Sequence, residues 1–254
     1  MKGRAAMEPE ALYHDPELAR FYDLANGWRE DFDFCTRLAE ASASVLDLGC
    51  GTGQLAAALA AAGDREVFGV DPADSMLEVA KGRQGGDRVH WVCADARHVR
   101  LGRRFELILM TGHAFQVFLT RDDRATLLET VAAHLAQGCR FLFDTRNPAR
   151  REWEEWTPEA SRERLSDPEL GEVDVWNDVA RDPATGIVTY QTHYEVVGTG
   201  RRFSADARLA FPERPEVETL IEAAGLRVLS LFGDWEGSPW HEDAREIVVL
   251  GGPA

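Results

Sequence analysis

The chain has 254 residues, of which 44% are hydrophobic, so it is long enough to bury one substantial core. Its formal net charge of −16 opposes binding to a phosphate backbone, and we expect no nucleic-acid partner. No apolar run approaches the roughly 20 residues that span a bilayer, the four cysteines form no C-x-x-C pair, and the seven histidines show no paired ligand spacing. We therefore expect a cytoplasmic protein with no membrane association and no metal.

The first part of the chain is predicted to be helical and then to alternate. Apolar residues recur at helical spacings from about Pro9 to Ala41, with Gly27 as a break. Strands are then predicted at Val45–Cys50, Val67–Val70, Val89–Ala94, Phe105–Met110 and Arg140–Asp144, and helices at Gln54–Ala62, Ala73–Gly82 and Asp122–Ala136. Strands that alternate with helices indicate a parallel sheet covered on both faces.

The pattern changes after about Pro148. Three long segments of alternating polarity, separated by turn sequences, predict an antiparallel meander at Val173–Arg181, Ile187–Val197 and Arg202–Phe211. The alternation resumes with a helix at Glu213–Ala224 and strands at Leu226–Phe232 and Glu246–Leu250. We predict an α/β fold with a Rossmann-like, seven-stranded, mostly parallel sheet, an N-terminal helical cover and an antiparallel β insertion. Its parts are residues 1–148 (helices and ligand-binding core), 149–212 (insertion, a substrate lid or dimer surface) and 213–254 (completion of the core).

The most informative segment is Val45-Leu-Asp-Leu-Gly-Cys-Gly-Thr-Gly53, in which a buried strand runs into three glycines and then a helix. Glycines permit positive φ and close approach of a ligand to backbone N–H groups. The helix start adds unpaired donors and a positive dipole end. The segment predicts a nucleoside-linked ligand lying across the strand ends.

Asp71, followed by Pro72, ends the next strand at about the interval expected for an acid that binds ribose hydroxyls. A carboxylate can accept two hydroxyl hydrogen bonds there. Alternatively, Asp71 caps the following helix, and the two roles are compatible.

The order Asp47-x-Gly49-x-Gly51-x-Gly53 distinguishes between nucleoside ligands. A dinucleotide fingerprint needs its third glycine one place later, where this chain has Gln54. The segment instead resembles the first motif of the class I S-adenosylmethionine-dependent methyltransferases, and the resemblance extends over Val45–Asp144 and the last two strands. It implies that the cofactor is S-adenosyl-L-methionine and that a methyl group is transferred, with the acceptor atom (N, O or C) left open.

The resemblance also implies roles for individual residues. Asp47 and the glycine turn would hold the methionine portion, Asp71 the ribose, and Met76, Asp95 and Ala96 the adenine; Thr111, Gly112 and His113 would line the passage to the acceptor. From the sequence alone, Asp95 could equally cap a turn. The aromatic residues Tyr13, Tyr22 and Trp28 of the N-terminal segment could face the sulfonium, or could simply belong to the core.

A narrower resemblance comes from Met110–Leu119 and Gly233–Pro239, which look like a branch of small-molecule methyltransferases with a β-rich insertion after the fifth strand. Candidate contacts to a small-molecule acceptor are Phe115, Gln116, Trp176, Tyr190, Tyr194 and Trp240. A general base is needed if the acceptor arrives protonated, and His113 is the candidate. The alternative is a histidine that bonds a loop carbonyl.

The meander is expected to place Trp176, Tyr190 and Tyr194 on one face and His193 on the other. An aromatic face with a few polar groups suits a small, partly apolar acceptor, and it suits a homodimer interface equally well.

Two other functions remain open at this point. An NAD- or FAD-dependent oxidoreductase is opposed by Gln54 and by the Asp47 start of the motif. A non-catalytic module that binds S-adenosylmethionine would keep the same motif without turnover. A nucleic-acid methyltransferase is disfavoured, because Thr111-Gly-His-Ala-Phe115 stands where many enzymes that act on exocyclic base amines carry Asn/Asp-Pro-Pro-aromatic.

Overall fold

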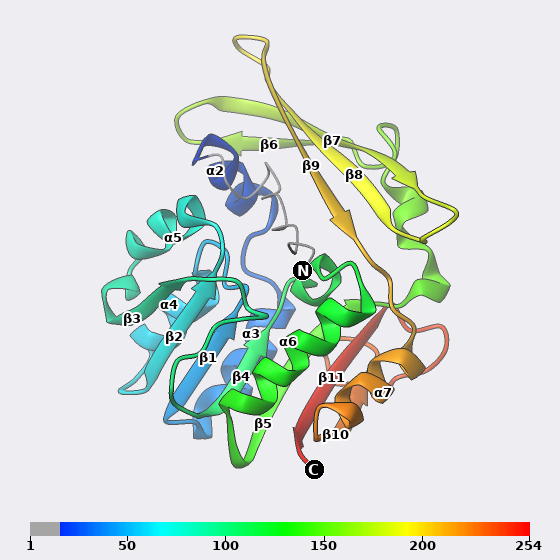
Figure 1. Ribbon diagram of the computed structural model, residues 1–254. Helices are drawn as coiled ribbons and strands as arrows, with labels where there is room; N and C mark the ends of the chain where they lie inside the picture. The colour runs from blue at the N-terminus through cyan, green and yellow to red at the C-terminus, as the bar shows by residue number, and fades with distance from the viewer. Residues whose placement is uncertain (1–15) are drawn as a thin grey trace, which may run out of the picture.

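The computed structural model describes residues 16–254, which form a large α/β unit with a second sheet above it (Figure 1). Strands of the larger sheet are β1 (Ser44–Leu48), β2 (Glu66–Asp71), β3 (Val89–Cys93), β4 (Phe105–Met110), β5 (Leu135–Arg146), β10 (Leu226–Phe232) and β11 (Glu246–Pro253). The helices are α2 (Pro16–Ala25), α3 (Glu30–Leu38), α4 (Gln54–Ala61), α5 (Asp74–Lys81), α6 (Arg121–His134) and α7 (Arg214–Ala223). Tyr13 lies outside the described residues.

The larger sheet has the order β10-β11-β5-β4-β1-β2-β3. Strand β11 is antiparallel to both β10 and β5, so it runs opposite to the other six strands. This confirms the predicted seven-stranded, mostly parallel sheet. The parallel strands β2 and β3 follow β1 on one side of it, whereas β4 and β5 lie on its other side. Ligands of open α/β sheets bind at such a switch point in the strand order, here between β1 and β4. Because β11 runs the other way, its first residue, Glu246, reaches the edge where the parallel strands end.

Apolar side chains cover both faces of this sheet. On one face, Leu127 of α6 and Ile221 of α7 are fully buried against strand residues such as Phe141. On the other, Cys35 of α3 and Leu59 of α4 pack in a second cluster. The strands are buried on both faces for this reason, and they read as continuous apolar runs in the sequence.

The second sheet consists of β6 (Glu163–Asp167), β7 (Gly171–Arg181), β8 (Val188–Val196) and β9 (Arg201–Leu209), antiparallel in that order. It lies over the edge where the parallel strands end, as the ribbon shows (Figure 1). Strand β6 was not predicted, because four of its five residues are exposed or only partly buried and its sequence, Glu-Arg-Leu-Ser-Asp, lacks a β-branched residue. The division of the chain at residues 148 and 212 remains a prediction.

Helix α2 lies between the second sheet and α5 (Figure 1). Leu18 and Phe21 pack on the sheet, and the Phe21 ring stacks on Tyr194 with centroids 4.7 Å apart. Ala19 and Tyr22 instead contact the cluster around Met76 of α5. The helix therefore belongs to two hydrophobic clusters at once.

The register of the second sheet corrects the expectation for Trp176. Trp176 pairs with His193, and the two rings stack at 5.2 Å, so both lie on the face opposite Tyr190 and Tyr194. Asn177 is the residue that shares the inner face, and it accepts a hydrogen bond from Thr192 Oγ1 at 2.8 Å. The loop at residues 182–187 sets this pairing, and a change of one residue in loop length would reverse it.

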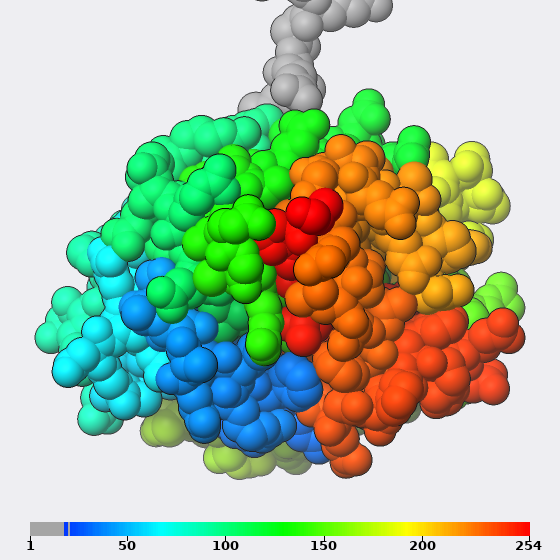
Figure 2. Space-filling model, turned by 90° about the horizontal axis from the view of Figure 1, so that it is seen from below, coloured from blue at the N-terminus to red at the C-terminus, as the bar shows by residue number. Residues whose placement is uncertain are grey.

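The opposite end of the molecule is formed by elements of the larger sheet. Seen from below, helix α7 and strand β10 lie beside the C-terminal strand β11, which separates β10 from β5, and the second sheet shows only at the margin (Figure 2). Within residues 16–254, no helix has the length and apolar character needed to cross a bilayer.

Candidate active site

The bend after β1 has the left-handed backbone that its glycines predict. Gly49, Gly51 and Gly53 have φ of 74°, 52° and 72°. The N–H groups of Gly49 and Cys50 donate to the carbonyl of Val70, at 2.8 and 3.1 Å, which fixes the bend against the end of β2. A Cβ added at Gly51 would meet no atom of residues 16–254 within 4 Å, so these residues leave that side of the bend open. Backbone N–H groups and open space together form a cradle for a ligand.

Asp71 braces this bend from the neighbouring strand. Its Oδ2 accepts a hydrogen bond from Gly51 N at 2.9 Å, and its Oδ1 accepts one from Ala73 N, also at 2.9 Å. Ala73 is the N-cap residue of α5. The carboxylate thus organises the start of α5, which was the alternative drawn from the sequence, and it does so at the bend itself.

Asp47, at the end of β1, is 2% exposed. Burial, and then the charge of Asp71, raises the pKa of Asp47 to about 7. No hydrogen bond from the described residues contributes to this pKa. A buried carboxylate that no hydrogen bond stabilises is costly, so the position fits a ligand that carries a cationic group.

Helix α2 lies close to the end of β4. A Cβ added at Gly112, just after β4, would lie 3.9 Å from the hydroxyl of Tyr22. Burial, followed by the proximity of Tyr190 and Asp71, raises the pKa of Tyr22. The Tyr22 hydroxyl therefore lies where the end of β4, the second sheet and the Asp71 carboxylate approach one another.

A polar cluster ties α2 to the glycine bend. Thr52 Oγ1 donates to Asp23 Oδ1 at 2.5 Å. Arg83, which follows α5, forms an ion pair with Asp23 and donates from Nε to the Thr52 carbonyl at 2.6 Å. This cluster was not predicted, because its members are far apart in the sequence.

The residues expected near an adenine have other contacts. Met76 is 1% exposed, beneath α2, and Ala96 is buried in the main core. Asp95 forms an ion pair with Arg97 at 2.5 Å, and its Oδ1 also accepts from Arg97 N at 2.9 Å. Asp95 thus makes the turn that was its alternative role. Pro72 is exposed at the start of α5, and Thr111 is partly buried at the end of β4.

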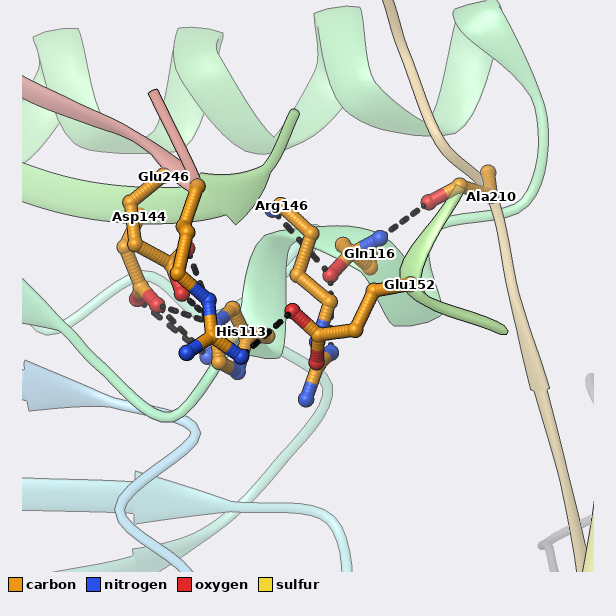
Figure 3. Close-up of polar contacts among 8 residues, drawn as sticks. His113, Gln116, Asp144, Arg146, Glu152, Ala210 and Glu246 are labelled. Carbon is orange, nitrogen blue, oxygen red and sulfur yellow. Dashed lines mark hydrogen bonds and ion pairs between the residues drawn. The ribbon is translucent and has the colours of Figure 1, made fainter. Parts of the chain in front are cut away.

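His113 lies at the centre of a cluster that the sequence did not reveal (Figure 3). Its backbone has φ 61° and ψ 23°, a left-handed conformation unusual for a residue other than glycine. The His113 N–H donates to both carboxylate oxygens of Asp144, at 3.2 and 3.1 Å. Its Nε2 lies 3.2 and 3.1 Å from the two oxygens of Glu246 and 3.2 Å from Asp144 Oδ2.

Sheet register brings the two carboxylates together. Glu246 pairs with Arg146 across β11 and β5, and Asp144 is two residues from Arg146, so all three side chains lie on one face. Asp144 is 1% exposed, and burial is the main cause that raises its pKa to about 6. Burial also acts to raise the pKa of Glu246, but the hydrogen bond and charge of His113, with Arg146, lower it below its ordinary value.

A third carboxylate, Asp31 of α3, is close enough to interact electrostatically with His113 and Asp144. Its Oδ1 is buried and has no hydrogen-bond partner in the part of the chain that the structure describes, and burial raises its pKa. We call His113, Asp31, Asp144 and Glu246 the His113 cluster. Single ligand atoms of His113, Asp144 and Glu246 lie within 4.8 Å of one another, close enough to hold a metal ion, although no histidine spacing indicated such a group.

Two residues expected to contact an acceptor, Phe115 and Gln116, are fully buried. Phe115 is 0% exposed, and its ring stacks on Phe143 in the core at 4.4 Å. Gln116 is also 0% exposed; its Nε2 donates to the Ala210 carbonyl at 2.8 Å and its Oε1 accepts from Arg146 Nη1 at 3.0 Å (Figure 3). Gln116 therefore ties the loop after β4 to the chain that leaves the second sheet.

The remaining aromatic candidates are divided between different environments. Tyr194, another residue expected to contact an acceptor, is 3% exposed beneath α2. Tyr190 is partly buried, and its ring lies 5.4 Å from that of Trp156. Trp240 lies under Arg214 and lines a separate cavity of about 750 Å³ between α7 and the end of β9, which none of the predicted cofactor residues lines.

Comparisons with known proteins agree with this geometry. Residues 45–138, which run from β1 into β5, match a family model described as a methyltransferase domain. Over 207 residues the chain is 26% identical to the cypemycin N-terminal methyltransferase of a Streptomyces species, and the match covers 82% of each protein. This chain is a class I S-adenosylmethionine-dependent methyltransferase. The match sets aside the oxidoreductase alternative.

Solved structures show how far the fold of this methyltransferase is shared. The CcbJ methyltransferase of Streptomyces caelestis superposes with a TM-score of 0.74 at 22% identity, covering 92% of this chain and 96% of that one. The sugar N-methyltransferase KedS8 of a Streptoalloteichus species superposes with a TM-score of 0.72 at 19% identity, covering 98% of each. Both likenesses extend over the second sheet as well as the larger one, so the β insertion belongs to the shared fold.

Proposed function

We propose that this methyltransferase transfers the methyl group of S-adenosylmethionine to the nitrogen of a small-molecule amine. The observation that carries the proposal is the His113 cluster, in which three carboxylates surround one imidazole beside the end of β4. Its negative charge suits an acceptor that arrives as an ammonium ion. Two of the similar proteins are named as a sugar N-methyltransferase and as an N-terminal methyltransferase, which supports the same acceptor atom.

The residues at the glycine bend fit the cofactor by charge and by shape. Asp47 is a buried carboxylate whose pKa no hydrogen bond from the described residues lowers, and we assign it to the ammonium of the methionine portion. The open side of Gly51 receives the ligand, and Asp71, already braced by two N–H groups, presents its carboxylate to the ribose. When bound, S-adenosylmethionine supplies a methyl group activated by its positive sulfonium.

Other residues complete the cofactor site. We propose that Met76, Ala96 and Asp95 border the adenine, although Asp95 must share its carboxylate with Arg97. Tyr22 of α2 faces Gly112, and together with Pro72 and Thr111 it encloses the remaining side of the cleft. An aromatic face near a sulfonium contributes about 0.5–2 kcal/mol.

On the acceptor side, an ammonium ion must lose a proton before its nitrogen can attack the methyl group. His113 is the base we propose, because its imidazole lies among the carboxylates that stabilise it once it is protonated. Tyr190 and Trp156 of the second-sheet region form an aromatic pair that can border the acceptor. Trp176 is not assigned to the acceptor, because it lies on the other face of that sheet.

The test is a product assay with matched acceptors. Purified protein is incubated with S-adenosylmethionine and sets of compounds that differ only in carrying an amine, a hydroxyl or a carboxyl group, and the methylated product and S-adenosylhomocysteine are quantified by mass spectrometry. We expect turnover within the amine set and a loss of about 100-fold or more in His113→Ala with cofactor binding retained. Turnover confined to hydroxyl or carboxyl acceptors, or undiminished turnover in His113→Ala, would contradict the proposal.

A further inference from the structure

Glu246 and His113 meet in a geometry that has a specific consequence for the imidazole. Both oxygens of the Glu246 carboxylate lie within hydrogen-bond distance of His113 Nε2, at 3.2 and 3.1 Å. A carboxylate at this distance accepts a hydrogen bond from the N–H of a neutral imidazole, so the ring nitrogen facing it carries the hydrogen. The other ring nitrogen, Nδ1, is then left with its lone pair.

We propose that Glu246 is a positioning residue that holds the proton on His113 Nε2 and so makes Nδ1 the base of the reaction, with Asp144 fixing the backbone that carries the ring. This inference rests on the proposed function for the role of the base. The tautomer itself is a property of the protein without substrate, and it can be measured separately.

The surroundings of Glu246 keep it ionised. It is directly opposite Arg146 in the sheet register, and the charges of Arg146 and Arg245 favour its carboxylate form. The negative groups that face the imidazole are Asp31, Asp144 and Glu246. Of these, Asp144 places one oxygen 3.2 Å from Nε2, whereas Glu246 places both of its oxygens there, at 3.2 and 3.1 Å.

Asp144 acts on the backbone of His113. The left-handed conformation is disfavoured for a residue other than glycine, and it persists where neighbouring groups hold it. Both Asp144 oxygens accept the His113 N–H, which holds the residue in that conformation. The strand that carries Asp144 is also paired with the strand that carries Glu246, so the backbone and the ring are positioned by one rigid element.

The acceptor ammonium gives one proton to His113 Nδ1, and the imidazolium that forms is stabilised by Glu246 at Nε2. The freed amine lone pair forms the bond to the methyl carbon, while the electrons of the carbon–sulfur bond stay on sulfur. The products are a methylated ammonium ion and the neutral thioether S-adenosylhomocysteine, and no oxidant or reductant is required.

The experiment combines nitrogen NMR of the histidines with a pH profile. Two-bond ¹⁵N–¹H spectra of the ¹⁵N-histidine-labelled full chain, without acceptor, are recorded for the unaltered protein and for Glu246→Gln, and His113→Asn identifies the His113 signals among the seven histidines. We expect the Nε2–H tautomer in the unaltered protein and a tautomer mixture in Glu246→Gln.

The kinetic arm uses the amine accepted in the product assay. In Glu246→Gln we expect kcat to fall about tenfold, the acid limb of the kcat–pH profile to move to lower pH, and the KM for S-adenosylmethionine to stay within about twofold. Glu246→Asp keeps the carboxylate and should recover part of the lost activity. The control is Glu78→Gln, which removes one charge from a side chain that is 64% exposed on α5 and should leave the profile unchanged.

Three results would overturn the proposal: an Nδ1–H tautomer in the unaltered protein, an unshifted tautomer and pH profile in Glu246→Gln, or stoichiometric metal bound by the three groups with activity lost on dialysis against EDTA. If no amine is methylated but the Nε2–H tautomer is found and depends on Glu246, then the proposed amine acceptor fails and the positioning role stands. Thermal unfolding and S-adenosylhomocysteine binding of each variant show whether a loss of activity is a loss of folding.

Discussion

The carboxylate of Asp71 accepts hydrogen bonds from Gly51 N and Ala73 N, each at 2.9 Å, so one side chain fixes both the glycine bend and the start of α5. Replacing it with alanine leaves two N–H donors without their acceptor and removes the proposed ribose contact. We expect Asp71→Ala to weaken S-adenosylhomocysteine binding by more than tenfold, about 1.4 kcal/mol or more, in isothermal titration calorimetry.

Asp74→Asn, an exposed acid in the first turn of α5, is the matched control for Asp71→Ala and should bind normally. Retained affinity in Asp71→Ala would remove the ribose assignment.

Asp47 links cofactor affinity to pH. The pKa of Asp47 is about 7 in the folded protein against an ordinary 3.8, so folding favours the protonated side chain. Burial of Asp47 therefore costs nothing below about pH 3.8. The free energy of unfolding then falls as the pH rises through 7, by about 4 kcal/mol in all. Asp47→Asn should therefore raise the unfolding temperature at pH 8 and weaken cofactor binding at least tenfold.

The same titration acts on binding in the unaltered protein, whose affinity for S-adenosylmethionine should decline as the pH falls below about 7. In Asp47→Asn this decline should be absent. Calorimetry at pH 6, 7 and 8 measures both, and a variant that binds as tightly as the unaltered protein at every pH would contradict the assignment.

Gly51 and Gly53 offer a matched pair within one bend. A Cβ at Gly53 would lie 2.4 Å from the Trp91 ring and 2.6 Å from Ala80, whereas one at Gly51 would meet no atom of residues 16–254 within 4 Å. Both positions have positive φ, so each alanine pays a backbone cost of about 1 kcal/mol. We expect Gly53→Ala to lower the free energy of unfolding by at least 1 kcal/mol more than Gly51→Ala, measured by urea titration.

For Gly51→Ala we expect the opposite balance: a loss of stability limited to that backbone cost, with a clear loss of cofactor affinity, because the methyl group occupies the open side of the bend. Equal stability of the two variants would show that Trp91 and Ala80 yield to the added methyl group.

Arg83 should matter for the cofactor without touching it. Its guanidinium holds Asp23 of α2 and the Thr52 carbonyl of the bend in one cluster. In Arg83→Ala, α2 loses its polar attachment to the bend, and we expect about three- to tenfold weaker S-adenosylhomocysteine binding with a small change in unfolding temperature. Arg88→Ala, which removes a side chain 45% exposed, is the control. Unchanged affinity in Arg83→Ala would mean that apolar packing alone holds α2.

The cofactor half of the site was predictable because its signals are local. Asp47 and the glycines adjoin one strand, and Asp71 ends the next, so the parallel order of β1 and β2 brings them together. The His113 cluster depends instead on the antiparallel pairing of β11 with β5, and nothing near Glu246 indicates that its partner is Arg146. Trp176 was assigned to the wrong face for a related reason: alternation gives the period of a strand, but the register comes from the loop between strands.

Helix α2 has one face on the second sheet and the other on α5, next to the cofactor bend. Any ligand that shifts the sheet must then also move a wall of the cofactor cleft. Binding of the two substrates should accordingly be cooperative, and by linkage each should alter the dissociation constant of the other by the same factor. The dissociation constant of the acceptor, measured with and without bound S-adenosylhomocysteine, gives that factor directly.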